Sequence, residues 1–294
     1  MIKKGLFRLG VLFLYLISLL PFWLLYLISD VLFVLLYYMI RYRRQVVWKN
    51  LKNSFPEKPD AELRDIERKY FRYLADLIME GIKLFTISKE EVQKRMVDVN
   101  REVIDEYFKQ GRSVINAAGH YGNWELAGVK MGLFTNNRSL IVYKALNNEV
   151  FDNAFKRMRS RFGTTVVEMH NTLRAFVSYR NELVFSVLAS DQTPVPHEIN
   201  YFTEFLNQPT AVFLGIEKLA KSMDHVVVFC DIRRVKRGYY QATFVPLFEY
   251  PKQTAEHEIT LAHVHYLEKV IREEPQYWLW SHKRWKYKPE DLHR

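Results

Sequence analysis

Cysteine is almost absent from this sequence of 294 residues, in which Cys230 is the only one. A single thiol excludes an intrachain disulfide and a zinc site built from several cysteines. His257, His263 and His265 lack the i, i+4 spacing and the carboxylate partner of a helical metal site, so we expect them on helix surfaces and predict no metal site. The sequence also lacks an internal repeat, a low-complexity tract and a nucleic-acid-binding motif. The lone cysteine fits a reducing, cytoplasmic setting for the folded part of the chain.

Acidic residues are fewer than basic residues in this sequence. The chain has 33 Asp and Glu against 43 Lys and Arg, which gives a formal net charge of +10. A positive balance suits an anionic partner, such as a nucleic acid, an anionic bilayer or a phosphorylated substrate. The basic residues are scattered along the chain, which argues against a nucleic acid. Aromatic residues make up 15%, a level typical of proteins that contact lipid or a membrane interface.

Charged residues are missing from residues 9–29, which are dominated by large apolar side chains. At ~1.5 Å per residue this stretch is about 30 Å long, close to the thickness of a hydrocarbon core. Asp30 interrupts the apolar run and residues 31–40 continue it. A signal peptide would have a shorter apolar core of ~7–15 residues that ends in small residues. We therefore expect one transmembrane helix, with residues 1–42 as a membrane anchor and residues 43–294 as the folded domain.

Basic residues follow the apolar run in greater number than they precede it. The cluster after the run consists of Arg41, Arg43, Arg44, Lys49 and Lys52. The positive-inside rule places the flank with more Lys and Arg in the cytoplasm. The sequence therefore predicts a single-pass protein whose large C-terminal domain is cytoplasmic.

From about residue 112, short apolar or β-branched runs alternate with helical patterns. Strands are expected at residues 113–118, 139–143, 164–168, 183–189 and 225–231, and helices at 125–134, 148–162, 172–180, 210–222 and 256–273. Residues 239–246 predict an added antiparallel edge strand. This alternation predicts an α/β domain with a central, mostly parallel sheet flanked by helices.

A histidine follows the first of these strands. The chain reads Ala-Ala-Gly-His-Tyr-Gly-Asn-Trp-Glu from Ala117 to Glu125. In an open α/β sheet ligands bind beyond the carboxyl ends of the strands, and a helix N-terminus there favours developing negative charge. We predict that His120 is a general base for an attacking hydroxyl, and that Glu125 holds the imidazole in the correct tautomer. The alternative is a capping histidine beside a surface glutamate.

The same His-x4-Glu spacing occurs again at His263 and Glu268. These two residues lie inside the predicted final helix. Five residues at ~100° each separate two side chains on a helix by roughly 140°, so this second pair cannot meet. The strand-loop-helix context therefore favours the first pair.

The block from Gly119 to Ala127 resembles the His-x4-Asp/Glu block of the lysophospholipid acyltransferase superfamily. More narrowly, it resembles that of the bacterial lipid A late acyltransferase family. Four further blocks agree in order: Asn-Leu-Lys-Asn-Ser-Phe-Pro-Glu from Asn50, Val-Tyr-Lys-Ala-Leu-Asn-Asn from Val142, Ser-Asp-Gln-Thr-Pro from Ser190, and Pro-Gln-Tyr-Trp-Leu-Trp-Ser-His-Lys-Arg-Trp-Lys from Pro275. The resemblance covers nearly the whole chain, and five ordered blocks are far more specific than any one.

The resemblance implies acyl transfer from an acyl carrier protein thioester to a hydroxyl of a lipid A precursor, at the cytoplasmic face of the bacterial inner membrane. It implies the base role for His120 and the orienting role for Glu125, with no metal and no organic cofactor. Lys144 stands where the family usually shows arginine. That exchange replaces a planar bidentate fork by a point charge, which leaves the exact acceptor open.

Other residues of these blocks are expected around the substrate. Asp191 and Gln192 follow a buried strand, and we expect them to line the acceptor pocket or to support the His120–Glu125 pair. Arg161, in a basic stretch with Arg157 and Arg159, suits acceptor phosphates or an acidic carrier protein, with a solvated helix face as the alternative. The full set of predicted substrate-binding residues is Asn123, Lys144, Arg161, Asp191, Gln192 and Arg284.

Two alternatives to the lipid A acceptor stay open on the sequence. One is an acyltransferase that acts on another membrane lipid, such as an aminolipid or a phosphatidylinositol mannoside. The other is a non-enzymatic, membrane-tethered protein that binds an anionic ligand, for which neither His120 nor Glu125 is needed. No motif in the sequence indicates the acyl-chain length or the oligomeric state.

Overall fold

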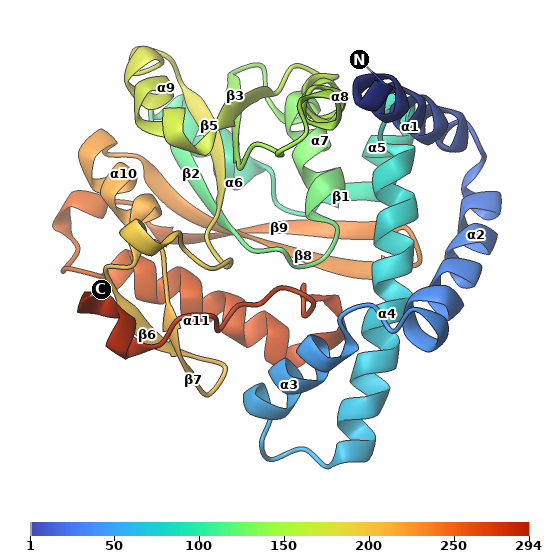
Figure 1. Cartoon of the computed structure of the whole chain (residues 1–294). Coiled ribbons are helices and arrows are strands. Elements are labelled where there is room, and N and C mark those ends of the chain that lie inside the picture. The colour runs from blue at the N-terminus through green and yellow to red at the C-terminus, as the bar shows by residue number, and fades with distance from the viewer. Residues whose placement is uncertain (1, 294) are drawn as a thin grey trace.

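The computed structural model describes residues 2–293 and is built around a seven-stranded sheet in the order β1-β9-β8-β2-β5-β3-β4 (Figure 1). The strands are β1 (Met96–Asp98), β2 (Val114–Ala118), β3 (Arg138–Tyr143), β4 (Thr165–Glu168), β5 (Val184–Ala189), β8 (Val226–Lys236) and β9 (Tyr239–Phe248). The strands from β8 to β4 are parallel to one another, whereas β9 is antiparallel to β8 and pairs in parallel with β1. The structure therefore confirms the predicted α/β class with a mostly parallel sheet.

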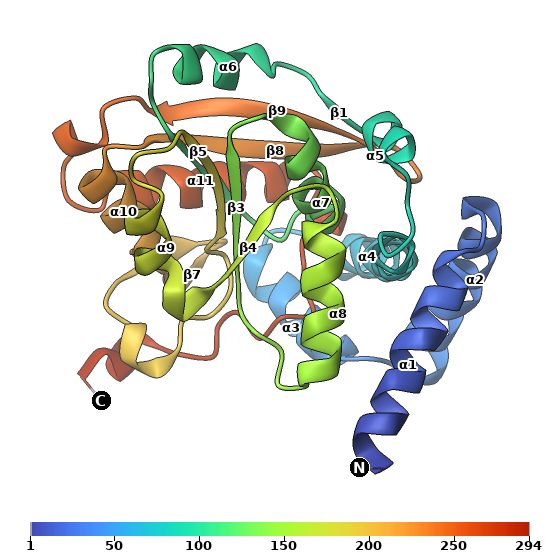
Figure 2. The same ribbon diagram turned by 90° about the horizontal axis from the view of Figure 1, so that it is seen from above.

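Helices cover both faces of the sheet, as parallel strands require. They are α3 (Arg44–Ser54), α4 (Asp60–Lys83), α5 (Lys89–Arg95), α6 (Glu102–Lys109), α7 (Trp124–Phe134), α8 (Glu149–Ser160), α9 (Thr172–Ser178), α10 (Gly215–Met223) and α11 (Glu258–Glu273). Val114 of β2 packs among side chains of α6 and α7, and its neighbour Ile115 packs on the opposite face with those of α10 and α11. Successive strand residues point to opposite faces, so each buried strand contributes to two cores. Figure 2 shows α6 and α11 on opposite sides of β8 and β9.

The predicted strands at 113–118, 139–143, 164–168, 183–189 and 225–231 are all present, with shifts of a few residues. The predicted start of the helix at residue 210 is wrong, because β6 (Phe202–Phe205) and β7 (Gln208–Ala211) form a hairpin there. Its two turn residues, Leu206 and Asn207, have φ of 51° and 59°, as a tight hairpin turn requires. The strand from residue 239 is antiparallel as predicted, but the three-residue strand β1 lies outside it, so it is not the edge of the sheet.

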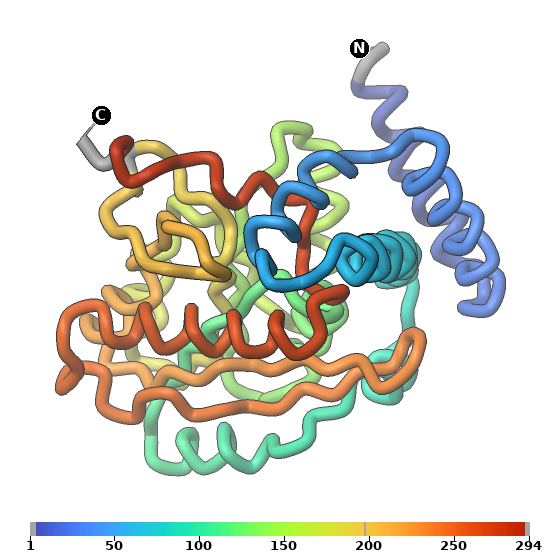
Figure 3. Tube along the Cα trace, turned by 90° about the horizontal axis from the view of Figure 1, so that it is seen from below, coloured from blue at the N-terminus to red at the C-terminus, as the bar shows by residue number. Residues whose placement is uncertain are grey.

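The N-terminal apolar run, expected to form one transmembrane helix, is divided at Pro21 into two helices. It forms α1 (Ile2–Ser18) and α2 (Phe22–Val34), and a π-helical turn, η1 (Leu35–Met39), prolongs α2. Pro21 precedes α2 in an extended conformation. Proline lacks an N–H and disfavours helix in the residue before it, so α1 ends before Pro21. The stretch long and apolar enough to cross a membrane is Phe22–Met39. Figures 1 and 3 show α2 beside α4, at one side of the molecule and away from the C-terminal end.

The C-terminal segment returns across the edge of the sheet where β2 ends. Short 3-10 turns punctuate this and other loops: η2 (Met169–Asn171), η3 (Pro196–Glu198), η4 (Pro251–Gln253), η5 (Pro275–Tyr277) and η6 (Pro289–His293). Trp278 forms an isolated antiparallel bridge with Tyr121. Trp278 and Trp280 are buried, so this segment closes the core around the loop that leaves β2.

Candidate active site

Small residues let the chain turn sharply between β2 and α7. A side chain at Gly119 would place its Cβ 2.7 Å from Cδ1 of Leu267, and Gly122 has φ of 60° with the carbonyl oxygen of Ile232 only 2.8 Å from such a Cβ. Neither position accommodates a larger residue without a shift of its neighbours. The turn projects His120 beyond the carboxyl end of β2, in the place predicted from the sequence.

Asp191 is the residue that holds His120. Strands β2 and β5 pair in parallel with Ala118 opposite Ala189, so the residues that leave the two strands emerge side by side. Nδ1 of His120 lies 2.6 Å from Oδ1 of Asp191, and the backbone N–H of His120 donates to Oδ2 over 2.8 Å. The indole Nε1–H of Trp278 donates to the same Oδ2, also over 2.8 Å. The carboxylate therefore accepts three hydrogen bonds.

The pair is strongly coupled electrostatically. The side chain of Asp191 is 3% exposed and that of His120 is 21% exposed. Burial raises the pKa of Asp191, but the charge and hydrogen bonds of His120 and the Trp278 bond overcome this and lower that pKa to about 2. Burial alone would lower the pKa of His120, but the Asp191 carboxylate more than offsets it, so the pKa of His120 is raised above 6.5.

The second ring nitrogen of His120 faces Gln192. Nε2 of the Gln192 amide lies 3.1 Å from Nε2 of His120. An ionised Asp191 can only accept, so Nδ1 carries the proton and Nε2 presents its lone pair to the Gln192 N–H. His120 is thus held in the tautomer whose Nε2 is free to take a proton from a substrate.

Glu125 does not contact the imidazole, which corrects the predicted geometry of the pair. Its carboxylate binds Arg159 of α8 in a bidentate ion pair, with Nε–Oε2 of 3.0 Å and Nη2–Oε1 of 2.6 Å. Asp191 fills the role predicted for Glu125, that of holding the imidazole tautomer, because the helix that starts at Trp124 carries Glu125 toward α8. Glu125 and Arg159 are still close enough to His120 to shift its pKa, Glu125 upward and Arg159 downward.

Asn123 is wrong as a substrate-binding residue, because its side chain is fully buried. Its Oδ1 accepts from the N–H of Leu126 and so caps α7. Its Nδ2 donates to Oε2 of Glu80 over 2.6 Å. Both ends of the amide therefore serve the fold, by fixing the helix that begins next to His120.

Arg284 is also buried rather than open to a substrate, with 3% exposure. Its Nη2 donates to the carbonyl oxygen of Ala211 over 2.6 Å, and Nε and Nη1 have no partner among the described residues. Burial lowers its pKa to about 10, although the Asp191 carboxylate acts in the opposite direction. Arg284, Asp191 and His263 line one small enclosed cavity behind the His120 loop. Arg284 therefore balances the charge of Asp191 from inside the protein.

His263 was expected on a helix surface, and that expectation is wrong. It lies on the inner face of α11, with 3% exposure. Burial lowers its pKa to about 4, so its ring is neutral. Glu268 pairs instead with Arg272 on the outer face of the helix, in agreement with the angular argument that separated it from His263.

Lys144 and Arg161 occupy exposed positions. Lys144 follows β3, at the same carboxyl edge of the sheet as His120. Arg161 follows α8, and its Nη1 donates to the carbonyl oxygen of Leu84 over 2.6 Å, so part of its guanidinium is already engaged. The structure brings Asp191 and Gln192 onto His120, and it leaves Lys144 and Arg161 outside that cluster.

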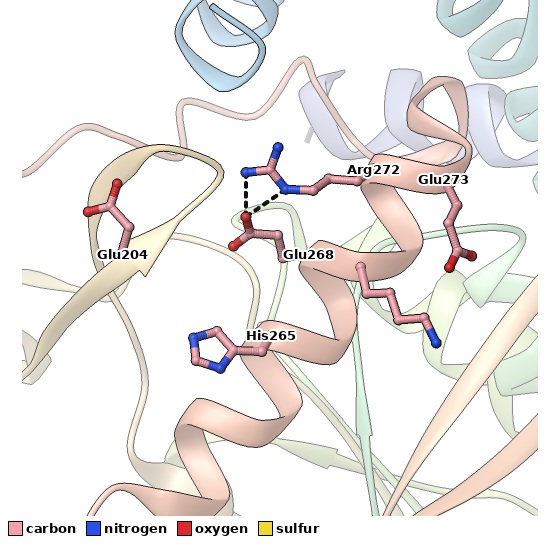
Figure 4. Close-up of a pocket in the computed structure, with 6 residues that line it drawn as sticks. Glu204, His265, Glu268, Arg272 and Glu273 are labelled. Carbon is pink, nitrogen blue, oxygen red and sulfur yellow. Dashed lines mark hydrogen bonds and ion pairs between the residues drawn. The ribbon is translucent and has the colours of Figure 1, made fainter. Parts of the chain in front are cut away.

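A separate hollow lies along the outer face of α11, with Glu204 of β6 across from it (Figure 4). Its lining also includes His265, Glu268 and Arg272. Nη2 of Arg272 forms an ion pair with Oε1 of Glu268 over 2.6 Å. His265 has no carboxylate partner in the described part of the chain. The hollow therefore lacks the buried acid–histidine coupling that distinguishes the His120 cluster. Within residues 2–293, no group of three or more His, Cys, Asp or Glu side chains is placed to hold a metal ion.

Trp278 and Arg159 are contributors to the site whose specific roles the sequence did not predict. Arg159 stands 34 residues from its partner Glu125, and Trp278 stands 87 residues from Asp191. Both belong to stretches that had been singled out, one basic and one rich in tryptophan. The signal was therefore present, but only the fold pairs each residue with its carboxylate.

Comparison with known proteins adds the identity of the relatives. A family model described as bacterial lipid A biosynthesis acyltransferase matches residues 1–287. The chain is 25% identical over 253 residues to a lipid A biosynthesis acyltransferase of Haemophilus influenzae, which covers 84% of this chain and 78% of that protein. It is 24% identical over 252 residues to a lipid A biosynthesis palmitoleoyltransferase of Escherichia coli, which covers 85% of this chain and 81% of that protein. The family match extends over both the N-terminal helices and the sheet domain.

Proposed function

The chain belongs to the bacterial lipid A biosynthesis acyltransferase family, and from this premise we propose that it moves a fatty acyl chain from an acyl carrier protein thioester to a hydroxyl group of a lipid A precursor. Membership makes it an acyltransferase of lipid A synthesis. The donor and the acceptor hydroxyl are the proposed parts. The acceptor hydroxyl is supported by the buried Asp191 carboxylate on Nδ1 of His120, which leaves Nε2 as a base for a hydroxyl. The acyl carrier protein donor rests on the family resemblance of the sequence.

The reaction follows from the tautomer of His120. The acceptor hydroxyl displaces the Gln192 amide from Nε2 and gives up its proton there while its oxygen attacks the thioester carbonyl. Asp191 stabilises the imidazolium that forms. The carbon–sulfur bond then breaks, the new ester remains on the acceptor, and the imidazolium returns the proton to the leaving sulfur. No nucleophile on the enzyme is required.

The oxyanion of this reaction needs donors that are already in place. We assign this task to backbone N–H groups in the first turn of α7, which begins at Trp124. A helix N-terminus carries about half a positive charge, and such donors cost no reorganisation when the charge develops. The Asn123 cap holds this turn in position.

Glu125 retains a proposed catalytic role, but an indirect one. Its bidentate bond fixes Arg159, which is stacked near Tyr143 at 5.7 Å from the ring centre. The pair places a fixed positive and negative charge close to His120. We assign it to positioning the acceptor, with Lys144 and Arg161 as exposed cations for acceptor phosphates.

The enzyme acts at the cytoplasmic face of the bacterial inner membrane in this proposal. Its N-terminal segment, residues 1–42, is the part that associates with the membrane, and residues 43–294 form the catalytic domain. The sequence predicts that this segment crosses the bilayer once. The contacts of α2 with the catalytic domain bear directly on that prediction.

Acyl transfer by the purified full-length protein tests the proposal. The assay uses radiolabelled acyl carrier protein thioesters with three acceptors: a lipid A precursor, an aminolipid and a phosphatidylinositol mannoside. Label on the lipid A precursor, lost in His120→Ala but kept in His170→Ala, is the expected result. His170 is a matched control because its side chain is 72% exposed.

Two other outcomes contradict the proposal in different ways. Label on one of the other lipids would keep the chemistry and replace the acceptor. A folded His120→Ala variant that keeps more than a tenth of the wild-type rate would remove the base assignment, because a general base contributes about 10²- to 10⁴-fold.

A further inference from the structure

The inner face of α2 packs against the catalytic domain along its length. Leu25, Ser29 and Phe33 recur every four residues and are buried, with 1%, 1% and 5% exposure. Residues four apart lie on the same face of a helix. This face packs on α4, and Tyr37 of the following π-helical turn stacks on Phe33 and packs on Phe71 of α4.

Polar bonds fix the middle of α2 to the domain. The hydroxyl of Ser29 donates to Oδ1 of Asp76 over 2.7 Å, and the hydroxyl of Tyr26 donates to Oε1 of Glu80 over 3.0 Å. Asp30 forms an ion pair of 2.8 Å with Arg237, at the tip of the β8–β9 hairpin. The charge that interrupts the apolar run therefore has a specific partner in the catalytic domain.

The same contacts continue beyond α2. Arg237 also binds Asp76 at 2.6 Å, so one guanidinium joins α2, α4 and the hairpin. At the end of α1, the ammonium of Lys83 donates to the carbonyl oxygens of Ser18 and Leu20, both over 2.9 Å. These bonds satisfy carbonyl groups that a helix end leaves unpaired. Both N-terminal helices are thus docked on the domain.

The outer face of the two helices is apolar and exposed. Trp23, Leu27 and Val31 form a stripe on α2 with 65%, 55% and 61% exposure. Leu9 and Phe13 on α1 are 63% and 61% exposed. Most of the large apolar side chains that are exposed among the described residues lie in residues 6–42. A contiguous apolar face of this kind marks an interaction surface.

A crossing of the bilayer by α2 conflicts with its bonds. Ser29 would lie near the middle of the hydrocarbon core together with its partner Asp76. Arg68 of α4 lies eight residues from Asp76, about 12 Å along the helix, which is inside the ~15 Å half-thickness of the core. Arg68 and Lys69 are 60% and 59% exposed, and an exposed charge inside the hydrocarbon core is strongly unfavourable.

We propose that α1 and α2 do not cross the membrane but lie in one leaflet, with their outer apolar face among the acyl chains of an anionic phospholipid surface. Cations border this face at Arg8 on α1 and at Arg41 after η1. Asp30 is the only acid in residues 1–42, and Arg237 neutralises it. An amphipathic segment with a basic border binds in the plane of an anionic interface.

This arrangement links the membrane surface to the catalytic loop. Glu80 accepts from Tyr26 of α2 through one oxygen and from Asn123, the cap of α7, through the other. Phe7 of α1 packs against Phe151 of α8, the helix that carries Arg159. The helices that face the lipid therefore contact the supports of the active site, which keeps the site at the level of its lipid acceptor. The inference rests on the membrane association proposed above and deepens it.

Cysteine labelling in spheroplasts tests the arrangement. Lys4→Cys and Gly215→Cys are the two labelling positions. The Lys4 side chain is 69% exposed and points to Glu149 of α8, away from the outer apolar face. Gly215 is exposed, and a Cβ there meets no atom within 4 Å. The native Cys230 serves as an internal blank, since burial raises the pKa of its thiol and leaves it unreactive. A membrane-impermeant maleimide is applied before and after lysis, and acyl transfer by each variant confirms that the fold is kept.

The expected result is loss of labelling at both positions in intact spheroplasts and labelling at both after lysis. Labelling of Lys4→Cys but not Gly215→Cys in intact spheroplasts would mean that the segment crosses once, and would overturn the inference. Labelling of both in intact spheroplasts would keep both sites on one side and contradict the cytoplasmic orientation of the proposed function instead.

Asp30→Leu supplies a second readout that does not depend on labelling. A docked helix loses its ion pair to Arg237, so the midpoint of thermal unfolding of the full-length protein should fall. A membrane-spanning helix loses only an unfavourable charge, so an unchanged or higher midpoint would contradict docking.

Discussion

Two buried carboxylates of this protein have similar surroundings and different consequences. Asp191, 3% exposed in its side chain, accepts bonds from the His120 backbone, the His120 ring and Trp278. Asp76, 1% exposed in its side chain, accepts bonds from Ser29, Arg234 and Arg237. Asp191 thus accepts three hydrogen bonds and Asp76 four, each in a place that excludes water.

The identity of the cation separates the two sites. A guanidinium keeps its proton at every physiological pH, so Asp76 can only join elements of the fold. An imidazole can exchange its proton near neutral pH, so the same arrangement at Asp191 prepares a base. Whether a buried carboxylate serves structure or chemistry depends here on whether its partner titrates.

The largest expected effect comes from exchanging each carboxylate for its amide. Asp191→Asn should lower the rate of acyl transfer by about 10²- to 10⁴-fold, because the amide no longer enforces the Nδ1–H tautomer. It should also destabilise the fold, because the buried Arg284 loses its counter-charge. Asp76→Asn should lower the free energy of unfolding by roughly 3–5 kcal/mol while the remaining folded protein stays active. Turnover rates and denaturant unfolding of both variants measure this, and similar losses of rate in the two would break the distinction.

The pH dependence of the rate should follow the His120–Asp191 pair. The neutral imidazole is the base, and Asp191 raises its pKa above 6.5, so the rate should fall by about tenfold per pH unit below that raised value. In Asp191→Asn burial acts on His120 without the opposing carboxylate, so the acidic limb of the profile should move to lower pH. Profiles of kcat/KM for both proteins compare the two limbs. A limb that stays in place would mean that another group titrates.

Glu125 should matter less than Asp191, because it reaches His120 only through space. Glu125→Gln is expected to slow transfer by roughly 10-fold, and Arg159→Gln by a similar factor, with the double variant no slower than either alone. That non-additivity is the signature of one functional unit, and a double-mutant cycle measures it. A loss in Glu125→Gln as large as that of Asp191→Asn would show that Glu125 contacts the imidazole during turnover.

The smallest effect is expected at Lys144, an exposed cation at the carboxyl edge of the sheet. Lys144→Ala should raise the KM for a phosphorylated acceptor by about 2- to 5-fold and leave kcat unchanged, since a solvated ion pair contributes up to ~1 kcal/mol. Lys109→Ala is the control, with a side chain that is 74% exposed and lies on α6. Equal effects from the two changes would remove Lys144 from the acceptor site.

Much of the fold was readable from the sequence because it depends on local patterns. Runs of β-branched and apolar residues predicted the parallel strands. Local bonds also set helix starts, since Ser88 caps α5 by accepting from the N–H of Glu91 three residues on. The elements that were missed are short: β1 has three residues, and β6 and β7 have four each. Such strands exist because of their partners, so their own residues carry little periodic signal.

The sequence by itself determined the reaction class, the place of His120 after a strand, and the presence of an apolar N-terminal segment. Each depends on residue types at fixed short spacings. Only the tertiary structure decided which carboxylate holds the imidazole, because Asp191 is 71 residues from His120 and reaches it through the pairing of β2 with β5. The tertiary structure also decided the role of Asp30. In the sequence this residue is a charge that interrupts a membrane segment, and in the folded chain it is half of an ion pair with Arg237, 207 residues away.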